Sequence, residues 1–117
     1  MEALVLFYQL LIGHAVADFV LQPSPMSSGK NRHQQLTEKH GEGFPPWYYW
    51  LSAHSLTHAG IVYLITSSLA YALIETLSHF VIDFLKCERS INLHQDQALH
   101  IAFKALYCVL FWYGWPV

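Results

Sequence analysis

The sequence predicts an all-α protein, an integral membrane bundle of about four transmembrane helices. The composition is 54% hydrophobic and only 12% charged, whereas charged residues make up about 25% of a typical soluble domain. Apolar runs of roughly the length that spans a bilayer recur four times along the chain, and aromatic residues gather at their ends. A chain of 117 residues is expected to form a single domain.

The first apolar run covers residues 3–21 and stops at Gln22 and Pro23. It approaches the ~20 residues that a helix needs to cross the hydrocarbon core. It lacks a basic start and carries HAVAD near its end, so we expect a retained helix rather than a signal peptide. Residues 23–46 are rich in Ser, Gly, Gln, Glu and Pro, which predicts a polar loop.

Three further helices are predicted at residues 48–65, 69–86 and 97–115. The second begins at the cluster Trp-Tyr-Tyr-Trp of residues 47–50, which is typical of a membrane interface. Only Thr66, Ser67 and Ser68 separate the second helix from the third, so these two are expected to form a tight hairpin. The fourth follows Asp96, a plausible first-turn acid, and ends in a second aromatic cluster.

The basic residues predict an orientation in the inner (cytoplasmic) membrane. Lys30, Arg32 and Lys39 follow the first helix, and Lys86 and Arg89 follow the third. The positive-inside rule places both loops in the cytoplasm and both termini outside. The six Lys and Arg are scattered and the net charge is -2, which argues against a stable nucleic-acid partner. Membrane lipid is the expected surrounding, and a homo-oligomer is compatible with so small a bundle.

Polar residues form one i, i+4 pair in each predicted helix region. All three Asp of the chain and five of its eight His belong to these pairs. On a helix this spacing puts both side chains on one face, where they can bind the same ion or neighbouring ions. The pairs are His14 with Asp18, His54 with His58, His79 with Asp83, and Asp96 with His100.

The positions of the pairs predict that they meet at one depth. They lie at the end of the first helix, the start of the second, the end of the third and the start of the fourth. With alternating helix directions and ~1.5 Å of rise per residue, all four pairs approach the cytoplasmic boundary. Glu75 and Lys104 lie one turn deeper, where we expect them to pair, unless Glu75 joins the metal site.

His and carboxylate side chains without paired Cys favour zinc, with manganese or iron as alternatives, and this many ligands suggests two or three ions. Polar packing between helices is the competing interpretation for any single pair. His33, His40 and His94 are interpreted as loop residues outside the site. The preferred ligands are His14, Asp18, His58, His79, Asp83 and His100, with His54 and Asp96 completing the candidate set.

The order HxxxDFxLQ, HxxxH, ExxxHFxIDxxK and DQxLH resembles an uncharacterised bacterial and phage membrane protein family called domain of unknown function three-three-zero-seven. The likeness covers nearly the whole chain except residues 23–46, and it implies no activity. The matching residues are His14, Asp18, Phe19, Leu21, Gln22, His54, His58, Glu75, His79, Asp83, Lys86, Asp96, Gln97 and His100.

The repeated His and acid pairs also resemble, more weakly, the zinc-dependent phospholipase C and P1 nuclease superfamily, whose relatives include membrane-bound metal-dependent hydrolases. That resemblance implies a three-zinc phosphoesterase site. This chain departs from the pattern because it is much shorter, has HxxxH in place of one expected pair, and has no N-terminal Trp ligand.

These observations favour a membrane-embedded metal-dependent hydrolase, a phosphoesterase acting on a lipid head group or a nucleotide-like phosphate at the cytoplasmic interface. Glu75, Asp83 and Lys104 are the candidate catalytic residues: Glu75 as a base, Asp83 as a ligand that steers a proton, and Lys104 or Lys86 as a phosphate contact. One alternative is a metal-ion or proton transport protein, because His and Asp chains also form relays. Another is a small membrane protein with a structural metal site.

Overall fold

The computed structural model of the chain describes residues 2–34 and 36–116, and this part contains helices and connecting turns but no strand. The prediction of an all-α fold is therefore confirmed. The elements in chain order are α1 (Ala3–Ala15), a π-helical turn (Val16–Val20), α2 (Ser24–Gly29), a 3-10 turn (Arg32–Gln34), α3 (Leu36–His40), α4 (Trp47–Thr66), α5 (Leu69–Cys87) and α6 (Leu93–Trp112).

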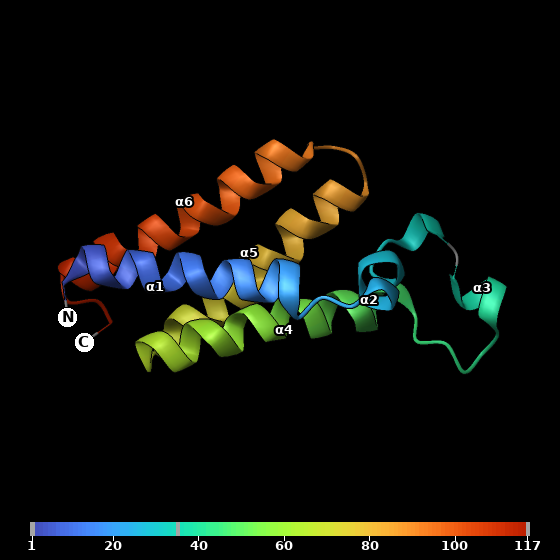
Figure 1. Ribbon diagram of the computed structural model, residues 1–117, viewed down its shortest axis with the longest axis horizontal. Helices are drawn as coiled ribbons and strands as arrows, with labels where there is room; N and C mark the ends of the chain where they lie inside the picture. The colour runs from blue at the N-terminus through green and yellow to red at the C-terminus, as the bar shows by residue number, and fades with distance from the viewer. Residues whose placement is uncertain (1, 35, 117) are drawn as a thin grey trace.

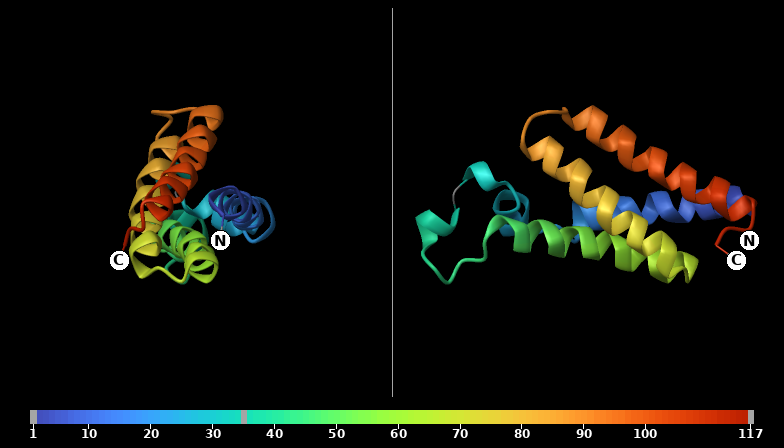
Figure 2. Two further views of the ribbon diagram at one scale, coloured as in Figure 1. Left: turned by 90° about the vertical axis from the view of Figure 1, so that its left-hand side faces the viewer. Right: turned by 180° about the vertical axis from the view of Figure 1, so that it is seen from behind.

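The four long helices form one elongated bundle with extents of 48 × 26 × 22 Å. Helix α4 packs against α5, α5 against α6, α6 against α1, and α1 against α4. Seen along the long axis, α1 lies on the side away from α5 (Figure 2). Both termini lie at one end of the bundle, whereas the short helices α2 and α3 lie at the other end (Figure 1).

Local backbone and side-chain signals mark the end of α4 and the start of α6. Ser67 adopts a left-handed conformation with φ 54°, and its N–H donates to the Tyr63 carbonyl at 2.7 Å, which closes the predicted α4–α5 hairpin. Asn92 and Gln95 form a capping box at the start of α6. This cap starts the helix at Leu93, four residues before the predicted boundary, and keeps Asp96 in the first turn.

The first predicted helix is regular only as far as Ala15. Its last turn is π-helical, and the Leu21 N–H donates to the Val16 carbonyl at 2.8 Å, five residues back. Such a turn accommodates one extra residue and changes the direction of the side chains around it. Asp18 lies in this turn, and its Oδ2 atom is 3.4 Å from Nε2 of His14, four residues back.

Residues 23–46, hereafter the cap segment, are mostly exposed, but they include short helices that the composition does not predict. The segment contains α2, the 3-10 turn and α3, and α2 packs against α4. A Cβ on Gly29 would meet Trp50 at 2.5 Å, so the two helices touch where only a glycine fits. Lys30, expected as an exposed cytoplasmic charge, is 3% exposed. Contacts between α2 and α4, which cannot be predicted from composition, hold the start of this segment against the bundle.

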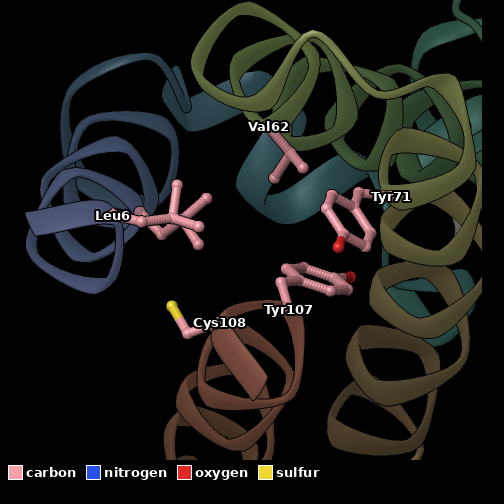
Figure 3. Close-up of a cluster of buried hydrophobic side chains, with 6 residues drawn as sticks. Leu6, Val62, Tyr71, Tyr107 and Cys108 are labelled. Atoms are coloured by element: carbon pink, nitrogen blue, oxygen red, sulfur yellow. The ribbon is translucent and has the colours of Figure 1, made fainter. Parts of the chain in front are cut away.

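The apolar core lies near the end of the bundle that carries the termini. Leu6 from α1, Val62 from α4, Tyr71 from α5 and Tyr107 from α6 point toward one another there (Figure 3). Leu10 and Cys108 complete this cluster. Burial of these side chains stabilises the four-helix contact by the usual ~25 cal/mol per Å² of apolar surface. The core closes the bundle on that side.

The described residues also bury many polar groups and leave many large apolar side chains exposed. Among the described residues, buried polar and charged side chains are as numerous as buried apolar ones. Leu69, Leu73, Leu77 and Val81 form a line along α5, and each is 54% to 71% exposed. By length and composition, one stretch of the described residues, Ala3–Val20, could cross a membrane.

Candidate metal centre

The four long helices bring all eight predicted ligands into one network between the apolar core and the cap segment. The six predicted ligands in α4, α5 and α6 are at most 2% exposed, and His14 in α1 is 6% exposed. The Asp18 side chain is 10% exposed. The residues in this network are His14, Asp18, His54, His58, His79, Asp83, Asp96 and His100.

Asp18, His54, His58 and His79 form the tightest group. One ligand atom from each lies within 4.8 Å of the others. The Nε2 atoms of His54 and His58 are 3.2 and 3.0 Å from the same oxygen, Asp18 Oδ1. Three imidazoles and one carboxylate are a donor set that suits zinc, and four such ligands are the number that a tetrahedral ion takes.

His79 gives an independent indication that this group fits a cation. Its ring is fully buried, and neither ring nitrogen has a hydrogen-bond partner among the described residues. It stacks on His58 at 3.7 Å and on His100 at 4.1 Å between ring centroids. Nδ1 lies 3.4 Å from Glu75 Oε1. Buried polar atoms are normally satisfied, so the Nε2 atom without a partner, beside three other ligand atoms, fits a bound metal ion.

His14 and His100 border this group without belonging to the set of four. The ring centroids of His14 and His100 are 5.3 Å apart, and the distance between the centroids of His14 and His58 is also 5.3 Å. The Nε2 atom of His14 lies 3.0 Å from Gln97 Oε1. Gln97 Nε2 in turn donates to Asp18 Oδ2 at 2.9 Å and to Asp96 Oδ2 at 3.1 Å. Gln97, which was not predicted as a site residue, thus connects three of the predicted ligands.

Asp83 and Asp96 contact lysines. The Lys30 ammonium donates to Asp83 Oδ2 at 2.6 Å. The Lys86 ammonium lies 3.2 Å from Asp83 Oδ1 and 3.8 Å from Asp96 Oδ2. Lys86 was considered as a phosphate contact, whereas Lys30 was missed because it belongs to the segment predicted as a solvated loop.

Glu75 and Lys104 form the expected pair one turn deeper. The Lys104 ammonium donates to Glu75 Oε1 at 2.6 Å, and the Tyr107 hydroxyl donates to Glu75 Oε2 at 2.7 Å. The Nδ1 atoms of His79 and His58 lie 3.4 and 3.9 Å from Glu75 Oε1. A carboxylate on the Nδ1 side of a histidine holds the ring so that Nε2 faces a metal. Tyr107 is a further member that the sequence analysis missed.

The cap segment is attached to the end of α5 by a second set of charges. Arg32 Nε donates to Glu88 Oε1, and the His33 ring lies 2.7 Å from Glu88 Oε2. The Arg32 hydrogen bond and the His33 contact hold the pKa of Glu88 below its usual value. His94, expected in a loop, lies in α6 and is exposed, whereas His33 and His40 lie in the short helical turns of the cap segment.

The chain was compared with known families, curated proteins and solved structures. No curated protein and no solved structure matches it, so the weaker resemblance to zinc-dependent hydrolases stays a hypothesis. Residues 6–114 match the family described as "Protein of unknown function (DUF3307)". This range includes all eight residues of the candidate centre. The chain therefore belongs to the DUF3307 family.

Proposed function

We propose that the protein is a multi-pass membrane protein with a metal-dependent hydrolase site, a phosphoesterase, at the cytoplasmic face. The membrane setting is supported by the exposed apolar line on α5 and by the buried charges at the centre of the bundle. In lipid, charged side chains face the bundle interior and apolar ones face outward. The 20 residues of α4 and of α6 give each a length of about 30 Å, enough to cross the hydrocarbon core.

The observation that carries the metal site is the convergence of Asp18, His54, His58 and His79 within 4.8 Å. Zinc is the expected ion, with manganese or iron as alternatives. A bound ion of this kind lowers the pKa of its water toward ~7 and polarises a phosphoryl oxygen. Asp18 Oδ1 and the Nε2 atoms of His54 and His58 would face the ion together, and Glu75 would orient His58 and His79 from their Nδ1 side.

A phosphate-containing substrate is supported by the charges around the site. Lys30 and Lys86 lie beside Asp83, at the end of the centre that faces the cap segment. Their ammonium groups can bind phosphate oxygens as point charges. A membrane lipid head group or a small phosphate compound from the cytoplasm would both offer this chemistry. In this proposal Asp83 serves as the proton-steering carboxylate, and Lys104 acts on Glu75 rather than on the substrate.

A transport protein is the second candidate, because buried His and Asp chains can relay protons or ions. Such a function needs a polar path to both faces of the membrane. The apolar core of Leu6, Leu10, Val62, Tyr71, Tyr107 and Cys108 lies between the centre and the end that carries the termini. This core favours a site with access from one side.

The first test is the metal content of the detergent-purified protein, measured by plasma mass spectrometry. We expect at least one zinc ion per chain in the wild type and a loss of it in His58→Ala and His79→Ala. His94→Ala is the matched control, because His94 is exposed on α6 and should leave the metal content unchanged. A folded, metal-replete wild type without any bound ion would refute the metal site.

The second test asks for phosphoesterase activity with a chromogenic phosphodiester and with phospholipid vesicles. The wild type should release product, and His58→Ala should reduce the rate at least about 100-fold, the size of effect that loss of a single oxyanion-hole donor has. Activity on vesicles alone would indicate a lipid substrate, and activity on soluble esters alone would indicate a small cytoplasmic one. Bound metal without hydrolysis of either would leave transport or a structural role.

A further inference from the structure

We propose that Tyr107 of α6 is a positioning residue of the candidate metal centre. Its hydroxyl fixes the carboxylate of Glu75, and Glu75 in turn holds the rings of His79 and His58 with Nε2 toward the ion. The inference rests on the proposed metal centre, but it does not depend on hydrolase activity. It gives a role in metal binding to a side chain of the apolar core that contributes no ligand.

Helix α6 supports the tightest group of ligands without belonging to it. The four ligand atoms that lie within 4.8 Å of one another come from the π-helical turn, α4 and α5. Helix α6 supplies Lys104 and Tyr107 instead, which are three residues apart and therefore lie on one face. Both side chains donate to Glu75. A helix outside the set of four thus determines where the Glu75 carboxylate lies.

Glu75 lies between these two donors and two of the ligands. Its Oε1 atom accepts from the Lys104 ammonium at 2.6 Å and lies 3.4 Å from His79 Nδ1 and 3.9 Å from His58 Nδ1. Its Oε2 atom accepts from the Tyr107 hydroxyl at 2.7 Å. A carboxylate in this position orients a metal-binding imidazole and raises its basicity.

The Tyr107 hydroxyl is the donor that fixes the plane of the Glu75 carboxylate. Rotation about the last bond of a glutamate side chain is broad, so one contact leaves the plane free to turn. The Lys104 ammonium acts as a point charge, and it attracts the carboxylate without setting this plane. A directed O–H donor on the second oxygen removes the freedom, so Oε1 stays toward His79.

The apolar core holds the Tyr107 hydroxyl in place. Tyr107 is 0% exposed, and its ring centroid lies 5.4 Å from that of Tyr71 and 6.5 Å from that of Phe103. Glu75 is 1% exposed, so bulk water does not supply a replacement donor. Loss of the hydroxyl therefore leaves Oε2 without this hydrogen bond and lets the carboxylate turn.

The test is the zinc affinity of the detergent-purified protein, measured by competition with a chromogenic chelator. Tyr107→Phe removes one hydroxyl and keeps the ring. We expect it to retain the zinc stoichiometry of the wild type and to bind zinc about tenfold to hundredfold more weakly. Tyr71→Phe is the matched control, because it removes from the same core a hydroxyl that donates to the Trp115 carbonyl rather than to Glu75. Its zinc affinity should equal that of the wild type.

Cobalt separates positioning from a general loosening of the core. Co²⁺ in the place of zinc absorbs visible light in bands that depend on the geometry of its ligands. Tyr107→Phe should change these bands, whereas Tyr71→Phe should not. Equal losses of zinc affinity in the two variants would mean that both hydroxyls only stabilise the core, and the proposal would be overturned. A wild-type affinity or a wild-type spectrum in Tyr107→Phe would overturn it as well.

A measurement on the metal-free wild type keeps the proposal testable if Tyr107→Phe does not fold. Long-range proton–nitrogen NMR correlations of the histidine rings should find a proton on Nδ1 of His79, facing Glu75. A ring protonated on Nε2 alone would contradict the proposal, because Glu75 could not then orient it from the Nδ1 side.

Failure of the metal centre and failure of this inference give different results. A wild type that binds no zinc refutes the metal centre, and this inference with it. A wild type that binds zinc no more tightly than Tyr107→Phe refutes only the role of Tyr107.

Discussion

At the scale of single residues, the centre is organised by side chains that contact several helices at once. Asp18 contacts His54 and His58 of α4 and accepts a hydrogen bond from Gln97 of α6. Glu75 does the same one turn deeper, with Lys104 and Tyr107 of α6 as its donors. Each of these carboxylates therefore positions side chains from more than one helix. Loss of one carboxylate charge should change the positions of more than one candidate metal ligand.

Glu75→Gln removes the charge that balances Lys104, and both side chains are 1% exposed. A buried ion pair that loses one partner leaves an uncompensated charge, which costs about 3 kcal/mol. We expect the free energy of unfolding in detergent, measured with denaturant, to fall by about this amount. Glu38→Gln, at an exposed position of α3, should change it by less than about 0.5 kcal/mol. Equal effects of the two variants would mean that the Glu75 pair contributes nothing.

The contact of Arg32 and His33 with Glu88 should depend on pH. The lowered pKa of Glu88 means that the folded protein favours the ionised carboxyl. The contact is then fully present above the ordinary glutamate pKa of ~4.3 and is lost as the pH falls through the lowered value. We expect amide hydrogen exchange at residues 31–34 to lose protection only in that acidic range. In Glu88→Gln the protection should be low at every pH, and a wild-type profile in that variant would contradict the assignment.

At the scale of helices, α1 and α4 are in tight contact at Gly13. A Cβ at this position would meet Ile61 Cγ2 at 2.5 Å, whereas a Cβ on Gly60 of α4 would meet nothing within 4 Å. We expect Gly13→Ala to destabilise the protein by about 1–3 kcal/mol through overpacking. Gly60→Ala should be neutral, or stabilising by up to about 1 kcal/mol through helix propensity. Thermal unfolding of the two variants in detergent makes this comparison, and a tolerated Gly13→Ala would mean that the helices separate easily.

Sequence periodicity and apolar runs predicted the four long helices, because these elements follow from local composition. The i, i+4 pairs predicted most of the centre for the same reason, since each pair needs only one regular helix. Lys30 and the π-helical turn around Asp18 were not predictable in this way. Lys30 reaches a residue 53 positions away, and the composition of its segment indicates solvent. Gln97 and Tyr107 were missed because neither belongs to a His or Asp pair.

For the whole molecule, the proposed orientation can be tested by cysteine labelling. Both termini lie at one end of the bundle and the cap segment at the other (Figure 1). With Cys87→Ala and Cys108→Ala as background, Lys39→Cys should react with an impermeant maleimide only from the cytoplasmic face. Tyr113→Cys, at a side chain 80% exposed, should react only from the outside. Labelling of both positions from one face would refute the four-span topology.

If the protein is the multi-pass membrane protein that we propose, the burial of charge inside the bundle has a consequence for its assembly. Among the described residues, Ala3–Val20 is the stretch apolar enough to enter a bilayer by itself. Helix α5 carries Glu75, His79 and Asp83 and would have to hide these groups against a neighbour as it leaves the translocon. We therefore expect α4 and α5 to insert as a hairpin through the Ser67 turn. In a glycosylation-mapping assay, isolated α5 should fail to span, and the α4–α5 pair should insert efficiently.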